Sequence, residues 1–321
     1  MVYNLNTNGV TQSQLLNFLK CRQYSKLNLA GWVPIKPSGA MQFGEMAHQI
    51  LEDIYGDLIA HRRTKIPDAG EIMERVGKLV KAYTRDFGQK AGTEVLERLE
   101  YNALLLESLL PVYFKHWGKE DFTKIKWLEV EKEFSFRLPL ADGTGITIKG
   151  KRDAAYAVGS SSYLFETKTK SQIDESTITE LLAFDFQTDL YSLAMHSDYG
   201  KYPSGIRYNI LRRPGNKVGK AESYPAFRKR ITDEINKKPE YYFMRYKIET
   251  SKSKIEAFRK ELIQIVTEFR DWQAGKLPTY KNTYSCISRY GTCQYINICG
   301  SNNFDGFRQR KEVHPELRSK T

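Results

Sequence analysis

The chain has 321 residues, of which 40% are hydrophobic and 27% are charged, so it can bury a core and is not a disordered polypeptide. Its 50 Lys and Arg and 38 Asp and Glu give a formal net charge of +12. This charge suggests a polyanionic partner, such as nucleic acid or an acidic membrane surface, although a merely soluble basic protein is an equal alternative. Four cysteines are too few for a disulfide-stapled secreted scaffold of this length.

The N-terminal residues show no basic segment followed by an apolar one, and no apolar stretch reaches the roughly 18 residues of a membrane helix. We therefore expect a soluble cytoplasmic protein with no membrane partner. At about 150 residues per domain, the length predicts two domains or one elaborated domain.

Helical spacing of apolar residues dominates the first third of the chain. It is clearest where Met46, Ile50 and Ile54 recur on one side of a segment. Four helices are predicted, at residues 11–24, 43–60, 70–89 and 93–117.

Alternation with a period of two, which is typical of strands, begins after this helical part. It predicts strands at 127–138, 145–158 and 162–170, followed by a helix at 176–196 and strands at 205–211 and 241–249, with a last helix at 252–274. Residues 212–239 are polar, basic and interrupted by Pro214 and Gly215, which predicts an exposed loop with a short helix. The order predicts a mixed α/β fold in a single domain (1–321), with a mostly helical part at 25–125 and a core at 126–275.

Two of the predicted strands, 145–158 and 162–170, carry charged residues that their shared turn would bring together. A two-residue loop at Gly159-Ser160 would place Asp153 opposite Glu166, whereas a four-residue loop would place Asp153 opposite Lys168. In both registers these three side chains share one face. Two carboxylates on an apolar sheet require neutralisation, and Mg²⁺ or Mn²⁺ with carboxylate, carbonyl and water ligands provides it.

The backbone carbonyl of Thr167 is a natural further ligand, and Lys168 can orient the metal-bound water or stabilise a developing oxyanion. A solvent-facing strand with a Glu–Lys pair is the plain alternative, because Glu-x-Lys by itself is common. The upstream Asp153 in register favours the metal site.

The ordered motifs resemble those of the PD-(D/E)xK nuclease superfamily. Asp153 and Glu166-Thr167-Lys168 are similar to its signature, although Arg152 stands where Pro is frequent. The segment 43–55 resembles the first motif of the RecB-like branch, with His48 at its histidine.

The segment 186–194 resembles the Q-x-x-x-Y motif of the same branch, with Gln187 and Tyr191 four residues apart and hence on one helix face. The resemblance implies a restriction-endonuclease-like core, with His48, Asp153, Glu166 and the Thr167 carbonyl as metal ligands. It also implies that Lys168, Gln187 and Tyr191 serve catalysis, the last two by holding the DNA strand or the lysine.

Three of the four cysteines, Cys286, Cys293 and Cys299, lie in a polar C-terminal segment, and Cys21 lies 265 residues before them. Buried thiols, a zinc site and a [4Fe–4S] cluster are the alternatives. One cysteine before the nuclease motifs and three after them is similar to the iron–sulfur nucleases of the AddB and CRISPR-adaptation type, which implies a [4Fe–4S] staple at 280–300 plus Cys21. The six residues between Cys286 and Cys293 depart from the usual two.

Residues 207–230 contain eight basic side chains and a single acidic one. Interleaved with Tyr208, Tyr224 and Phe227, they suit a groove that follows phosphates while bases stack, although a solvated loop is equally compatible.

The combined expectation is a metal-dependent DNA exonuclease of recombination or repair that resembles phage-encoded members. An endonuclease, CRISPR-type end processing and a non-catalytic DNA-binding scaffold remain alternatives, with a homo-oligomer or a recombination protein as further partners.

Overall fold

A six-stranded mixed sheet lies at the centre of the computed structural model, which describes residues 3–35, 39–87, 92–288, 291–314 and 317. Its strands are β1 (Val10–Thr11), β3 (Lys126–Pro139), β4 (Gly145–Val158), β5 (Ser161–Lys170), β6 (Gly205–Arg212) and β7 (Phe243–Glu249). Along the sheet the order is β1-β4-β5-β6-β7, with β3 paired to β4. The β5–β6 and β1–β4 pairs are parallel, and the other pairs are antiparallel.

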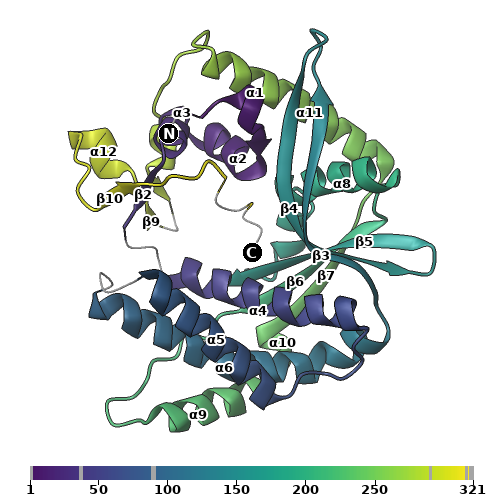
Figure 1. Cartoon of the computed structure of the whole chain (residues 1–321), viewed down its shortest axis with the longest axis vertical. Coiled ribbons are helices and arrows are strands. Elements are labelled where there is room, and N and C mark those ends of the chain that lie inside the picture. Colours follow the sequence, from purple (N-terminus) through teal and green to yellow (C-terminus); the bar gives the residue numbers. More distant parts are fainter. Residues whose placement is uncertain (1–2, 36–38, 88–91, 289–290, 315–316, 318–321) are drawn as a thin grey trace.

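Helices cover both faces of this sheet (Figure 1). Leu164 and Ile206 point into one hydrophobic core with α1 (Leu5–Asn8), α2 (Gln12–Lys20), α7 (Ile178–Leu182), α8 (Phe186–Tyr199) and α11 (Lys252–Gln273). Phe165 and Leu211 point into a second core with α4 (Gly39–His61), α5 (Ala69–Phe87), α6 (Thr93–Thr123), α9 (Tyr224–Lys237) and α10 (Pro239–Tyr242). Neighbouring residues of one strand thus feed opposite cores, as strand geometry requires.

A third, small core joins the two ends of the chain. It contains Leu27, Tyr295 and Ile298. The elements around it are α3 (Arg22–Leu29), β2 (Trp32–Pro34), η2 (Thr283–Ser285), β8 (Ile287–Ser288), β9 (Gly291–Thr292), α12 (Ile296–Ser301) and β10 (Phe307–Gln309). Strand β10 pairs antiparallel with β2, so the C-terminal segment is bound to the N-terminal one by backbone hydrogen bonds.

The predicted α/β fold with a mixed central sheet flanked by helices is confirmed. Two predicted helices are each divided in two. The segment 11–24 breaks at Cys21, whose extended backbone ends α2 and begins α3. The segment 176–196 breaks at 183–185, where Asp185 caps α8 by accepting the Gln187 N–H at 3.0 Å.

The short helix predicted within 212–239 is present, but it is longer than expected and one of its faces is buried. Residues 224–237 form α9, which packs Phe227, Ile231 and Ile235 into the second core against α6. These three residues follow helical spacing, and the apolar face they form is sufficient to bury the helix.

In the described residues, none of the helices combines the length and the apolar character that crossing a membrane requires.

Candidate active site

The charged residues of the β4–β5 hairpin meet where these two strands separate. Pairing runs from Val158 opposite Ser161 to Ala154 opposite Phe165, so the loop is the two-residue Gly159-Ser160 turn, with Gly159 at φ +58°. The next opposed positions in this register are Asp153 and Glu166, and strand pairing ends before them. The backbone N–H of Thr167 instead donates a hydrogen bond to Asp153 Oδ2 at 2.9 Å. We call the point where β4 and β5 separate the strand fork. There the Thr167 hydrogen bond gives the Asp153 carboxylate a fixed position beside a pocket.

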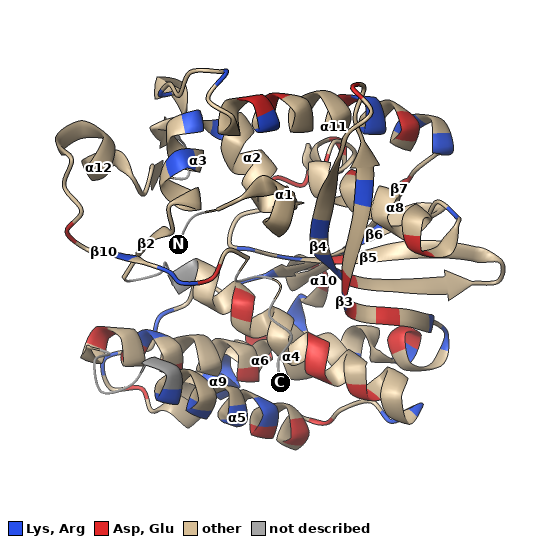
Figure 2. Ribbon diagram, turned by 45° about the horizontal axis from the view of Figure 1, so that its top comes forward, with Lys and Arg blue, Asp and Glu red and all other residues tan. Residues whose placement is uncertain are grey.

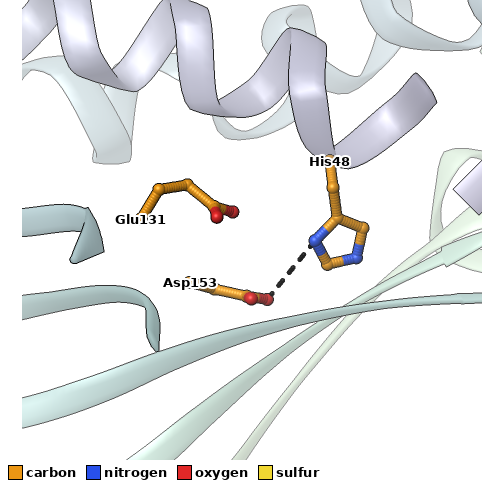
Figure 3. Close-up of side chains that lie close together, drawn as sticks. All are labelled: His48, Glu131 and Asp153. Carbon is orange, nitrogen blue, oxygen red and sulfur yellow. Dashed lines mark ion pairs between the residues drawn. The ribbon is translucent and has the colours of Figure 1, made fainter. Parts of the chain in front are cut away.

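Helix α4 and strand β3 bring two further ligand-type side chains to Asp153 (Figure 3). His48 Nδ1 lies 3.6 Å from Asp153 Oδ2, and one ligand atom each from His48, Glu131 and Asp153 lie within 4.8 Å of one another. These residues line one pocket with Glu52 and Tyr55 of α4. A histidine nitrogen and two carboxylates at this spacing form a donor set suited to a divalent cation.

Glu131 is the site residue that the sequence reasoning missed. Its neighbours in β3, Val130 and Lys132, pair with the residues on either side of Asp153, so Glu131 lies opposite Asp153. Its φ of +47° is uncommon for a residue with a side chain. Its carboxylate pairs with Lys151 Nζ. The alternating segment 127–138 contained the signal, but only the β3–β4 pairing reveals which of its glutamates faces Asp153.

The predicted catalytic residues on β5 and α8 form one hydrogen-bonded chain. Lys168 Nζ donates to Glu166 Oε1 at 2.7 Å and to Gln187 Oε1 at 2.6 Å, and Gln187 Nε2 donates to the Tyr191 hydroxyl at 2.9 Å. Asp185 Oδ2 lies 3.7 Å from Lys168 Nζ. Gln187 therefore contacts the lysine directly, and Tyr191 contacts it only through Gln187.

Of the four predicted metal ligands, the structure gathers His48 and Asp153, together with Glu131. Glu166 is only 2% exposed and is bonded to Lys168, and it does not belong to the close group. Thr167 lines the same pocket as His48 and Asp153. Its side chain accepts a hydrogen bond from Asn209 Nδ2 at 3.4 Å.

The electrostatics of this region favour a positive ion. Burial raises the pKa of Glu166, and the nearby Asp153 carboxylate raises it further. Burial likewise raises the pKa of Asp153 and of Glu131, and for Glu131 the second cause is Asp153. Burial lowers the pKa of His48, which leaves a neutral imidazole able to bind a metal. Lys151 and Lys168 compensate part of the charge of the three carboxylates. A divalent cation beside Asp153 would compensate the rest.

Lys168 carries a permanent positive charge beside these carboxylates. Burial alone would lower the pKa of Lys168, but Glu166 and Asp185 outweigh burial and raise it. The ammonium can therefore stabilise negative charge or orient a water molecule, but it is not poised to accept a proton at neutral pH.

All four cysteines line a single pocket between the two ends of the chain. Each is a free, half-buried thiol, and the backbone N–H of Asn282 donates to Cys21 Sγ at 3.3 Å. The N–H of Cys293 donates to the carbonyl of Cys286 at 2.8 Å. The tertiary structure thus brings Cys21 to cysteines that follow it by more than 260 residues.

The basic segment 207–230 is not the base-stacking groove that its composition predicted. Tyr208 and Phe227 are fully buried, because both belong to hydrophobic cores. Four of its arginines bind acidic side chains, namely Arg207 with Glu120, Arg212 with Glu175, Arg228 with Glu107 and Arg230 with Glu222. Lys229 pairs with Asp233 in the same way. Most of this positive charge is therefore compensated within the protein.

The model of the PD-(D/E)XK nuclease superfamily matches residues 10–300. None of the curated proteins matches the sequence significantly. Among solved structures, the chain is similar to a candidate exonuclease from Eubacterium rectale, at 11% identity and a TM-score of 0.46 over 86% of this chain and 85% of that one. It is also similar to a phage-related exonuclease from Haemophilus somnus, at 12% identity and a TM-score of 0.33 over 64% and 83% of the two chains.

Proposed function

The chain belongs to the PD-(D/E)XK nuclease superfamily, and from this premise we propose that it is a metal-dependent deoxyribonuclease that hydrolyses phosphodiester bonds at DNA ends. The observation that carries the proposal is the convergence of His48, Glu131 and Asp153 beside the Glu166–Lys168 pair at one strand fork. An ordinary structural ion pair needs no histidine and no third carboxylate.

The donor set fits Mg²⁺ or Mn²⁺, because it offers carboxylate oxygens and one neutral imidazole. Asp153 and His48 would hold the cation with Glu131, and Glu166 and the Thr167 carbonyl are the ligands that the family resemblance adds. When bound, the cation supplies an activated water and neutralises charge on the phosphodiester.

The residues around the proposed metal site orient Lys168, whose ammonium would stabilise negative charge on the phosphate. Lys168 is held by Glu166 and Gln187, so its ammonium stays close to the position where the phosphate gains negative charge. Gln187 is itself fixed by Tyr191, whose ring packs edge-on against Phe134 at a centroid distance of 5.6 Å. These contacts support one orientation of the lysine.

We further propose that the four cysteines bind a [4Fe–4S] cluster with a structural role. The four thiols line one pocket between the two ends of the chain, which supports a single shared centre. A cluster held there would tie the end of α2 to the C-terminal segment.

The cluster proposal is tested by iron and acid-labile sulfide analysis of the protein purified without oxygen. Cys21→Ala should lose the brown colour and much of its soluble yield, since the link between the two ends is removed. A colourless, folded and fully active variant lacking all four cysteines would refute a structural cluster, and stoichiometric zinc would replace it.

Activity is tested on end-labelled single- and double-stranded DNA with Mg²⁺ or Mn²⁺. We expect degradation that Asp153→Ala abolishes, whereas Asp233→Ala, which removes an exposed acid paired with Lys229 on α9, serves as the control. Absence of degradation with either cation would leave the non-catalytic DNA-binding scaffold as the better description. Intact circular single-stranded DNA separates an exonuclease from an endonuclease.

End trimming in recombination or repair is the role that the family resemblance favours, with CRISPR-type end processing as the alternative. A homo-oligomer or a recombination partner and a cytoplasmic location, that of the host if the protein is phage-encoded, complete the proposal.

A further inference from the structure

More than half of the net positive charge of this protein lies in the segments that surround the cysteines. Residues 1–44 and 272–304 together contain seven Lys or Arg and no Asp or Glu. These basic residues are Lys20, Arg22, Lys26, Lys36, Lys276, Lys281 and Arg289, of which Lys36 and Arg289 lie outside the described residues. Figure 2 shows basic residues on α3, acidic residues on α4, and residues of both signs on α11. Arg22 and Lys276 pair with Glu268 and Asp271 of α11. Lys20, Lys26 and Lys281 form no ion pair with an acidic side chain in the described part of the chain, and this uncompensated charge attracts a partner of the opposite sign.

The two segments form one continuous surface. The backbone N–H of Gln23 donates to the carbonyl of Tyr280 at 3.2 Å, and Ser285 Oγ donates to the carbonyl of Lys20 at 3.0 Å. Lys20 and Lys281 both lie at the pocket that the cysteines line. We call the exposed residues Lys20, Lys26, Tyr280, Lys281 and Tyr284 the cysteine-side surface.

Two tyrosines of this surface project into solvent. Tyr284 is 94% exposed, more than any other large apolar or aromatic side chain among the described residues, and Tyr280 is 54% exposed. The Arg22 guanidinium lies 4.8 Å from the centroid of the Tyr280 ring and holds that ring from one side. Tyr284 contributes nothing to a core, so its ring is free to take a partner.

This combination selects one class of partner. Lysines spaced among exposed aromatic rings suit single-stranded nucleic acid, whose phosphates bind the lysines while its unpaired bases stack on the rings. In the sequence, the helix that carries His48 follows the N-terminal part of the cysteine-side surface closely. Strand β2 ends at Pro34 and α4 begins at Gly39, and His48 follows nine residues later, about 14 Å along the helix.

We propose that the cysteine-side surface binds single-stranded DNA and delivers it to the hairpin site, with Tyr284 and Tyr280 stacking on bases and Lys20 and Lys281 binding phosphates. The proposal rests on the proposed nuclease function and adds that the protein binds its DNA as a single strand.

Fluorescence anisotropy of a labelled oligothymidylate, without added divalent cation, measures the binding. Tyr284→Ala should raise the dissociation constant by about 5-fold to 100-fold, as expected for one lost base stack, and Tyr284→Phe should restore it. Lys281→Ala should reduce the slope of log affinity against log salt by about 0.7. Equal iron content in wild type and variants shows that the cysteine site is intact.

Two controls decide between this surface and others. Tyr224→Ala removes a 51% exposed tyrosine of α9 in the compensated basic segment, and it should leave binding unchanged. Unchanged affinity in the Tyr284→Ala/Tyr280→Ala double variant, a larger loss in Tyr224→Ala, or an equal loss for duplex and single strand would overturn the proposal.

Hydrolysis of a small substrate, thymidine 5′-(p-nitrophenyl phosphate), separates this proposal from the proposed function. The tyrosine variants should hydrolyse it as the wild type does, because it has no further nucleotides that could bind the cysteine-side surface while its phosphodiester occupies the hairpin site. If wild type cleaves it and DNA but the double variant binds DNA normally, only the binding surface is wrong. If wild type binds single strands through Tyr284 yet cleaves nothing, only the nuclease function is wrong.

Discussion

Asp121→Ala tests the buried ion pair between Asp121 and Arg245, which contacts the helix that carries His48. Asp121 is fully buried at the end of α6, and its carboxylate accepts two hydrogen bonds from the Arg245 guanidinium, both at 2.7 Å. It accepts a third from the Tyr55 hydroxyl at 2.6 Å. Tyr55 lies on α4 two turns after His48 and lines the same pocket. The pair therefore fixes the helix that presents the histidine.

The cost of the substitution follows from what it leaves behind. The Arg245 side chain is 5% exposed, so the variant retains a buried charge whose main partner is gone. Breaking such a pair costs about 3–5 kcal/mol of the free energy of unfolding. Arg245 keeps hydrogen bonds to Glu120 at 3.2 Å and to the Tyr113 hydroxyl at 2.8 Å, which places the expected loss near the lower figure, about 3 kcal/mol.

Thermal unfolding followed by circular dichroism measures this loss, and we expect Tm to fall by about 6 °C or more. The double variant Asp121→Leu/Arg245→Met should recover most of the loss, because it leaves no unpaired charge. Arg98→Ala, which removes an exposed pair with Glu94 on the same helix, should cost no more than about 1 kcal/mol. A loss below about 1 kcal/mol in Asp121→Ala, or a double variant less stable than the single one, would refute this reasoning.

Three further perturbations test the site and its surroundings. Glu131→Gln should raise the Mn²⁺ concentration for half-maximal activity by about tenfold, since a charged ligand is lost, while Glu133→Gln on the exposed side of β3 should not; equal metal requirements would remove Glu131 from the site. Lys168→Met should lower kcat by about 10²-fold or more with little change in metal requirement, and a large change in that requirement alone would reassign the lysine to metal binding. The hydrogen bond from Arg63 lowers the pKa of Glu71 to about 2, so the ionised carboxylate stabilises the fold fully above pH of about 4.5 and progressively less as pH falls. Wild type should therefore exceed Glu71→Gln in stability by about 1 kcal/mol at neutral pH and match it near pH of about 2, and a difference independent of pH would contradict this assignment.

The catalytic hairpin could be predicted from local sequence because its information is local. Alternation with a period of two identifies both strands, and a Gly-Ser turn limits the register to a choice between two loops. The observed loop opposes Asp153 to Glu166 without any contribution from distant residues. For the same reason, the four-residue spacing of Gln187 and Tyr191 placed both on one helix face before their hydrogen bond was known.

Interactions between distant segments were not accessible in this way. Composition marked 207–230 as a basic surface, yet the partners that compensate its arginines, such as Glu107 for Arg228 and Glu120 for Arg207, lie about 90 to 120 residues away. Charge in one segment is informative about a surface only when the acids that fold against it are known.

The sequence by itself determined the α/β character of the chain and the positions of Asp153 and Glu166 on one hairpin, because strand and helix periodicity are properties of neighbouring residues. Only the tertiary structure decided that Glu131 joins His48 and Asp153, that Glu166 turns to Lys168, and that both ends of the chain meet around the cysteines. Those outcomes depend on how β3 pairs with β4 and how α4 packs across the fork, and packing between segments far apart in the chain is not encoded in any local pattern.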